Sequence, residues 1–234
     1  MTYSNKQLIL DVYSKIFGQG DLSFADAVIA DDYIQHNPMV KTGKAGFMDF
    51  LNLLKQMPRP DSPKKPSMRL ISDNNFIAVH TQIEFMGKEN VTIDLYRIEN
   101  GFLAEHWDAV QEIVDSKPKV IGSIEIDHKE QTGVNKEFIH DFVTQVLIER
   151  QTTNSSYFLS ENLSLTDFSF DYDNFKLHRL IGEKNFVLTQ SEVEIKGELF
   201  VQYDIYRISK QLIVEYWTVK QSIPKEMAHT NGMI

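Results

Sequence analysis

An internal repeat constrains the fold of this chain more than any other feature of its sequence. The segment Val91 to Gln111, VTIDLYRIENGFLAEHWDAVQ, returns as Val201 to Gln221, VQYDIYRISKQLIVEYWTVKQ. The period of about 110 residues matches a domain and is far longer than the repeats of solenoid proteins. In each copy, two runs rich in β-branched and aromatic residues flank a short polar break, which predicts a β-hairpin. The 234 residues therefore predict two copies of one domain.

The composition limits the partners and the compartment. The net charge of −9 argues against nucleic acid or an anionic membrane as partner, because both require a basic surface. The chain has no cysteine, so disulfides and thiolate chemistry are excluded. Its N-terminal MTYSNKQLIL lacks the charged and apolar regions of a signal peptide, and no run of about 18 apolar residues occurs. We therefore expect a cytoplasmic protein that acts on or binds a small molecule.

Each copy is predicted to place helices before strands. In the first copy, apolar side chains at three- and four-residue spacing predict helices at 5–17, 21–30 and 46–57. A proline-rich loop at 57–66 and strands over 68–85 lead into the hairpin. This order is typical of an α+β domain with N-terminal helices packed on one face of a curved antiparallel sheet. We predict domains at 1–116 and 134–234, joined by a linker at 117–133, with no counterpart of the third helix in the second domain.

The candidate catalytic residues are polar groups on strands that otherwise have a core-like composition. Strand alternation puts His106 and Asp108 on one face of their strand and Trp107 on the other. His80 lies on a preceding strand and His36 in the loop before the third helix, and we expect the histidines and Asp108 to converge on one cavity. A carboxylate in an apolar pocket has a raised pKa and can serve as a base near neutral pH, while an imidazole polarises the substrate.

Structural roles for these residues stay open. A strand histidine is more often a hydrogen-bonded structural residue, and Asp108 at a strand end equally suits a turn cap. Three histidines and a carboxylate also suggest a metal site, but no pair has the tight spacing of a recognised one, so we expect neither metal nor cofactor. Trp107, Tyr96 and Arg97 recur in the second copy, which favours core or interface roles for them.

Three motifs carry a family resemblance: DDYIQHNP at Asp31 to Pro38, the Gly43-Lys44 pair, and DLYRIENGFLAEHWDAVQ at Asp94 to Gln111. The first half thereby resembles the SnoaL-like polyketide cyclases, whose cone-shaped α+β barrel fold is shared with nuclear transport factor 2 and ketosteroid isomerase. The resemblance and the repeat together imply two such barrels in tandem. The resemblance implies an aldol ring closure without cofactor or metal, with Asp108 as acid and base and His80 in the same pocket. To substrate binding we assign Tyr33, His36, Gln82, His106 and Trp107.

The second copy keeps no acid or base at the candidate positions. It replaces His80, His106 and Asp108 by Gln190, Tyr216 and Thr218. We therefore predict one active domain and one degenerate domain. Two functions stay open for the active domain. One is a cofactor-independent cyclase, isomerase or lyase, and the other is a protein that binds a small apolar or carbonyl-containing ligand without turnover.

The repeat also predicts how the copies assemble. By the resemblance, domains of this fold commonly pair through the outer faces of their sheets, and such a two-fold contact uses the same patch on each partner. We expect the two copies to form this contact within one chain, as an intramolecular pseudo-dimer with Glu105/Glu215 and Trp107/Trp217 at the contact. The alternative is that each half pairs with another chain, giving a higher oligomer.

Overall fold

The computed structural model describes residues 4–57, 67–85, 87–114 and 119–234. The proline-rich loop predicted at 57–66 lies, except for its first residue, outside the described residues. The same is true of the domain boundary predicted at 116, which stays a prediction. None of the helices in the described part of the chain is long and apolar enough to cross a membrane.

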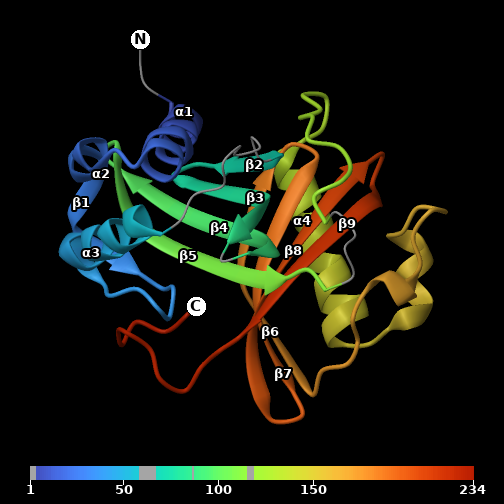
Figure 1. Cartoon of the computed structure of the whole chain (residues 1–234). Coiled ribbons are helices and arrows are strands. Elements are labelled where there is room, and N and C mark those ends of the chain that lie inside the picture. Colours follow the sequence, from blue (N-terminus) through green and yellow to red (C-terminus); the bar gives the residue numbers. More distant parts are fainter. Residues whose placement is uncertain (1–3, 58–66, 86, 115–118) are drawn as a thin grey trace.

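The first half consists of helices and a five-stranded sheet (Figure 1). Its helices are α1 (Asn5–Asp11), continued by π-helical turns over Val12–Gln19, α2 (Leu22–Val28) and α3 (Gly43–Gln56). Its strands are β1 (Ile29–Gln35), β2 (Met68–Asp73), β3 (Phe76–Phe85), β4 (Lys88–Glu99) and β5 (Phe102–Glu112), in the order β1-β5-β4-β3-β2. The side chains of Ser4 and Asp21 accept backbone N–H bonds at the starts of α1 and α2, which explains where these helices begin.

Strand β1 is the main departure from the predicted elements. The helix predicted at 21–30 ends at Val28, and the chain then runs parallel to β5, so the sheet is not purely antiparallel. Ile29, Tyr33 and Gln35 are buried along this strand, whereas its middle residues are exposed. Such a strand is stabilised by pairing with β5, which lies about 70 residues later in the sequence, and a local pattern carries no trace of that pairing.

The second half repeats the plan with fewer parts. It contains α4 (Thr132–Phe142), continued by π-helical turns over Val143–Ile148, and the antiparallel strands β6 (Asn174–Glu183), β7 (Phe186–Ile195), β8 (Glu198–Ser209) and β9 (Leu212–Ser222). Only short 3₁₀ turns stand between the π-helical turns and β6, so the described residues contain no counterpart of α3, as predicted. The chain is thus two tandem α+β units, each with helices packed on a curved sheet.

The two predicted hairpins are present, and their turns share one geometry. Asn100 and Gly101 have φ angles of 52° and 83°, and Lys210 and Gln211 have 53° and 57°. Two consecutive positive φ angles are the geometry of a type I′ turn, which matches the twist of the flanking strands. The second turn adopts it without glycine, so the long strands β8 and β9 must impose it.

Three apolar clusters form the core. One lies between the helices and the sheet of the first half, and a second lies between α4, the following turns and the sheet of the second half. The third lies between the two sheets, whose strands cross in Figure 1, and includes Ile93, Leu95 and Trp107 from the first half with Tyr203 and Ile205 from the second. The outer face of each sheet is therefore covered by the other.

The polar contacts between the halves come in matching pairs. The guanidinium carbon of Arg69 lies 3.6 Å from the ring centroid of Trp217, and that of Arg179 lies 4.2 Å from the ring centroid of Trp107. Arg69 and Arg179 are 110 residues apart, as are Trp107 and Trp217, so the repeat relates one contact to the other. Equal contacts made in both directions are the pattern of an isologous interface.

Further pairs follow the same rule, but the two glutamates do not. The backbone N–H groups of Gly182 and Ser72 donate to Asp73 and Glu183, and those of Val110 and Lys220 donate to Gln221 and Gln111. Glu105 instead accepts from Arg97 within its own half, and Glu215 accepts from Arg207 within its own half. No contact in the described chain joins the two glutamates to each other.

Candidate active site

Strand register separates the predicted site residues into two groups. His80 of β3 is paired with Ile93 of β4, which is paired with Ala109 of β5, whereas Asp94 of β4 is paired with Asp108. Directly paired residues project to the same face, and neighbours along a strand project to opposite faces. His80 therefore lies on the outer face of the sheet and Asp108 on the inner face. The expectation that both converge on one cavity is wrong.

The inner face carries a compact group of ionisable side chains, Asp94, His106 and Asp108. His106 Nε2 lies 3.0 Å from Asp94 Oδ1, and carboxylate and imidazole atoms of all three residues come within 4.8 Å of one another. From the first helical segment, the hydroxyl of Tyr13 donates to Asp94 Oδ2 over 2.6 Å. The group is thus built from β4 and β5 and closed by the N-terminal helices.

Gln35 determines the protonation of His106. Its Oε1 accepts the backbone N–H groups of His36 and Asn37, both at 2.9 Å, which identifies this atom as the oxygen of the amide. His106 Nδ1, 2.9 Å from the same oxygen, must therefore be a donor, while Nε2 faces the Asp94 carboxylate. Both ring nitrogens then carry a proton, so His106 is an imidazolium paired with Asp94.

The pKa of His106 agrees with this assignment. Burial lowers the pKa of the imidazole, but its hydrogen bond to Asp94 and the negative charges of Asp108 and Asp94 outweigh burial and raise it. The direction of the pKa shift and the hydrogen-bond partners of the ring both favour a positive charge on His106, beside Asp108.

Asp108 has the properties expected of a base that works near neutral pH. Burial raises its pKa to about 6; the His106 charge opposes this, the Asp94 charge adds to it, and the hydrogen bond from Asn37 opposes it. Asn37 Nδ2 donates to Oδ2 over 2.5 Å, whereas the buried Oδ1 has no hydrogen-bond partner among the described residues. One oxygen of the carboxyl group is thus held in place and the other is free to take a proton.

The raised pKa predicts a pH-dependent cost in stability. The folded chain keeps the Asp108 proton up to about pH 6, whereas an unfolded aspartate loses it near pH 4, so the folded state binds more protons between these values and its stability falls as the pH rises. Asp108→Asn removes this cost. We expect the free energy of unfolding to increase by roughly 2 to 3 kcal/mol above pH 6 and to stay unchanged below pH 4. Urea unfolding at pH 4 and pH 7.5 measures both values, and an equal gain at both would contradict the burial of the charge.

The remaining predicted site residues are divided between the two faces. Tyr33 is 1% exposed, packs on Phe47 and lies on the inner side, where the charge of Asp108 adds to the effect of burial in raising its pKa. Trp107 lies in the core between the sheets, and Gln82 donates to Glu89 on the outer face. These two do not reach the inner group.

His80 and His36 have structural partners at the contact between the halves. Arg69 Nη1 lies 2.7 Å from His80 Nδ1, and burial together with the Arg69 charge lowers the pKa of His80 to about 3, so the ring is neutral and accepts the bond. His36 stacks on Trp107 with ring centroids 4.7 Å apart, and its Nε2 lies 2.9 Å from a Glu105 oxygen. Neither ring is directed at Asp108.

The sequence analysis missed Asp94, Gln35, Asn37 and Tyr13 as members of the site. Asp94 recurs as Asp204, which in the second half accepts from the hydroxyl of Tyr216 over 2.6 Å. Counting outward from the Asn-Gly turn would bring Asp94 opposite Trp107, because the strands pair Ile98 with Leu103 and then Arg97 with Glu105, which leaves Ala104 as a bulge. The pairing of Asp94 with Asp108 depends on this bulge, for which the sequence carries no signal. Gln35 and Asn37 flank His36 in the DDYIQHNP motif.

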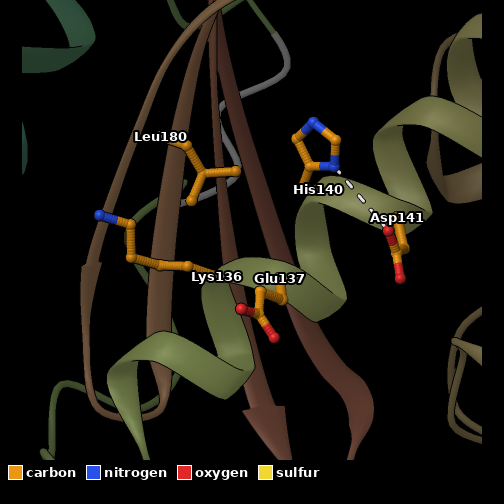
Figure 2. Close-up of a pocket in the computed structure, with 5 residues that line it drawn as sticks. All are labelled: Lys136, Glu137, His140, Asp141 and Leu180. Atoms are coloured by element: carbon orange, nitrogen blue, oxygen red, sulfur yellow. Dashed lines mark ion pairs between the residues drawn. The ribbon is translucent and has the colours of Figure 1, made fainter.

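Two hollows of the described surface lie away from Asp108. One of about 280 Å³ is lined by Lys136, Glu137, His140, Asp141 and Leu180 on α4 and β6 (Figure 2), where the only ion pair drawn joins His140 and Asp141 at 3.8 Å. A second, of about 370 Å³, lies between the halves and is lined in part by Tyr216 and Thr218, the counterparts of His106 and Asp108. Neither is lined by Asp108.

Asp94, His106 and Asp108 are the described residues that come close enough together to be considered as metal ligands. Both nitrogens of His106 are already engaged, Nδ1 by Gln35 and Nε2 by Asp94, so a metal would have to break one of these bonds and remove a proton. The donor set fits an ion-paired imidazolium better than a metal centre.

No protein-family model matches the chain, and no curated protein is similar to it. Among solved structures it is similar to TsrD from Streptomyces laurentii, with 20% identity over 47% of this chain and 90% of that one and a TM-score of 0.36. It is also similar to IdmH, a proposed polyketide cyclase from Streptomyces antibioticus (20%, 45%, 91% and 0.36), and to an NTF-2-like protein of unknown function from Burkholderia xenovorans (13%, 53%, 99% and 0.39). With TM-scores below 0.5 these similarities carry no argument about the reaction.

Proposed function

We propose that the first half catalyses proton transfer at a carbon next to a carbonyl group of a small molecule, with Asp108 as general base and acid. The supporting observation is the Asp108 carboxyl group: it is buried, one of its oxygens has no partner, and its pKa is about 6. Ring closure, isomerisation and elimination all begin with this step. The resemblance to polyketide cyclases favours ring closure among the three.

The neighbouring groups divide the work of such a step. Asp108 Oδ1 takes the proton, and the electron pair of the C–H bond moves onto the carbonyl oxygen to give an enolate. The His106 imidazolium stabilises the negative charge, first on Asp108 and then on the enolate. In ring closure the enolate carbon attacks a second carbonyl carbon of the same molecule, and the Asp108 proton passes to the alkoxide oxygen formed there. In isomerisation the proton is returned to a carbon atom instead. Asn37 keeps the carboxyl group in one orientation throughout.

Binding without turnover is the second candidate. Asp108 is only 5% exposed and lines neither of the two hollows described above. The inner group is screened by Tyr13, Tyr33 and Tyr96, whose hydroxyl pKa values burial raises well above the usual range. A ligand would therefore have to displace side chains to reach Oδ1. A protein that only binds its ligand has no need of that access.

Deuterium exchange distinguishes the two candidates without requiring the natural substrate. Cyclic 1,3-diketones and β,γ-unsaturated ketones would be incubated with the protein in D₂O, and deuterium at the α-carbon would be followed by NMR. Proton transfer by Asp108 predicts exchange faster than in buffer, with a pH midpoint near 6. Ligands that shift the protein resonances but show no faster exchange would support the binding protein instead.

We also propose that the second half serves as the dimer partner of the first within one chain, with the domains divided at 1–116 and 134–234. The supporting observation is the set of reciprocal contacts, led by Arg69 with Trp217 and Arg179 with Trp107. The second half keeps the outer sheet face that makes this contact and lacks the imidazole and the second carboxyl group of the inner site.

A further inference from the structure

The C-terminal segment of the second half crosses to the first half. After β9 the chain runs back toward β5 and α3, and the C-terminus lies beside them in Figure 1. The segment ends in the core between the sheets, where Met233 is 2% exposed and Ile234 packs against the same cluster. An apolar anchor therefore fixes residues 228–232 over the first half.

Five hydrogen bonds join these residues to one loop of the first half. The Ala228 N–H donates to Pro38 O over 2.8 Å, His229 Nε2 lies 2.9 Å from Asn37 O, Asn231 Nδ2 donates to Gln35 O over 2.9 Å, and His36 Nδ1 lies 2.9 Å from Gly232 O. Asn231 Nδ2 also reaches Thr42 Oγ1 at 3.0 Å. The bound loop is residues 35–42.

The tautomer of His229 follows from its two partners. Asn37 O can only accept, so Nε2 carries the proton and donates it. The backbone N–H of Asn231 points at Nδ1 over 3.3 Å, so Nδ1 accepts. A neutral imidazole thus satisfies both contacts and brings no charge to the loop.

The loop holds both polar groups that position the inner site. Gln35 accepts from His106 through its side chain, and Asn37 donates to Asp108 through its side chain. The segment from the second half binds the main-chain carbonyl groups of the same two residues, through Asn231 and His229. The backbone is therefore held from outside while the side chains point inward.

The linker around Gly122 contacts the second half at the position that corresponds to the contact of the C-terminal segment with the first half. These linker contacts involve no candidate acid or base. Gly122 stands at the repeat position of Gly232, and both have positive φ, 107° and 78°. Around Gly122, Ile121 O accepts from Trp217 Nε1 and the Ser123 N–H donates to Glu215. The crossing is thus common to both halves, but among the described residues only the C-terminal segment contacts a loop whose side chains are hydrogen-bonded to an acid and a base.

We propose that His229 and Asn231 are positioning residues for the active site of the first half, supplied by the second half. They fix the backbone at Gln35 and Asn37, and through these two side chains they orient His106 and Asp108. The proposal rests on the proposed function for its catalytic meaning, but the placement it describes can be measured without any turnover.

The test uses the full chain with both His229 and Asn231 replaced by alanine. Asn37 would then lose its outside support and its bond to Asp108 would weaken. Because that bond favours the ionised carboxyl group, the midpoint of the Asp108 titration, followed by ¹³C NMR, should move up by about 1 pH unit. The ¹⁵N resonances of the His106 ring should shift as well, because Gln35 is released.

Two matched variants complete the test. Thr230 lies between the two residues and its side chain is exposed. Thr230→Ala should therefore leave the Asp108 midpoint and the ¹⁵N resonances of the His106 ring unchanged. His229→Gln, combined with intact Asn231, keeps an N–H donor for Asn37 O and should restore the original Asp108 midpoint. Both variants should remain folded, because the changed side chains lie at the surface of the contact.

An unchanged Asp108 midpoint and unchanged His106 ring resonances in the double variant would overturn the proposal. The loop would then keep its geometry without the contacts from His229 and Asn231. An upward shift with no deuterium exchange in any variant would support positioning while removing the proposed catalysis. An upward shift with slower exchange and unaltered ligand affinity would support both.

Discussion

Asp108→Asn is expected to lower the rate of α-deuterium exchange by roughly 10² to 10⁴-fold, the usual contribution of a general base. Asparagine has nearly the volume of aspartate and can still accept the bond from Asn37 through its amide oxygen. It cannot take a proton at Oδ1, the atom that is left without a partner. Exchange measured at pH 7.5 on one active ketone, together with the circular dichroism spectrum, separates a lost base from a lost fold.

His80→Gln is the matched control for this substitution. The second half carries Gln190 at the repeat position, and its Oε1 accepts from Arg179 over 2.5 Å as His80 accepts from Arg69. Glutamine therefore suits the outer face, and exchange should stay at the wild-type rate. A His80→Gln protein that loses exchange while Asp108→Asn retains it would reverse the assignment of the two residues.

Activity and stability should respond to Asp108→Asn in opposite directions. The substitution removes the base and also removes the cost of burying its charge, so the variant should be less active and more stable above pH 6. If the carboxyl group served the structure alone, its replacement would remove a stabilising hydrogen bond. The variant would then be less stable, and its exchange rate would not fall. The combination is therefore more informative than either measurement.

The sequence predicted local features of this fold well and long-range ones poorly. The hairpins, the start of the strands near 68 and the missing third helix of the second half depend on turn residues and apolar spacing within short windows, and the structure has them. Strand β1 depends on pairing with β5, which no window contains. The carboxyl group of Asp108 was found because a polar residue on a core-like strand is unusual in any register.

The partners of Asp108 were harder to predict, for a reason of geometry. Alternation along one strand tells which residues share a face, but relating faces between strands requires their register. His80 and Asp108 belong to different strands, and a shift of one residue exchanges the faces. The place of His36 depends on Trp107 and on Gly232, which is 196 residues away in the sequence and contacts it through the crossing segment.

The first half expressed alone, as fragment 1–117, should not be a stable monomer. Its outer sheet face includes Ile93, Leu95, Trp107 and Ala109, each no more than 1% exposed in the whole chain. Without the second half this apolar face would be open to water, which favours association. We expect the fragment to form a homodimer or aggregates in size-exclusion chromatography with light scattering. The whole chain, measured at the same concentration, serves as the reference.

Adding the second half as a separate chain, residues 119–234, tests which surface causes the association. If the reciprocal contact drives it, the two fragments should form a 1:1 complex, because Trp217 and Arg179 offer the face that Trp107 and Arg69 bind in the whole chain. The complex would also return the crossing segment to the Gln35 loop, so the Asp108 titration should regain its original midpoint in the complex and not in the homodimer. A monomeric, stable fragment 1–117 would refute the internal pairing, since a face that tolerates water needs no cover.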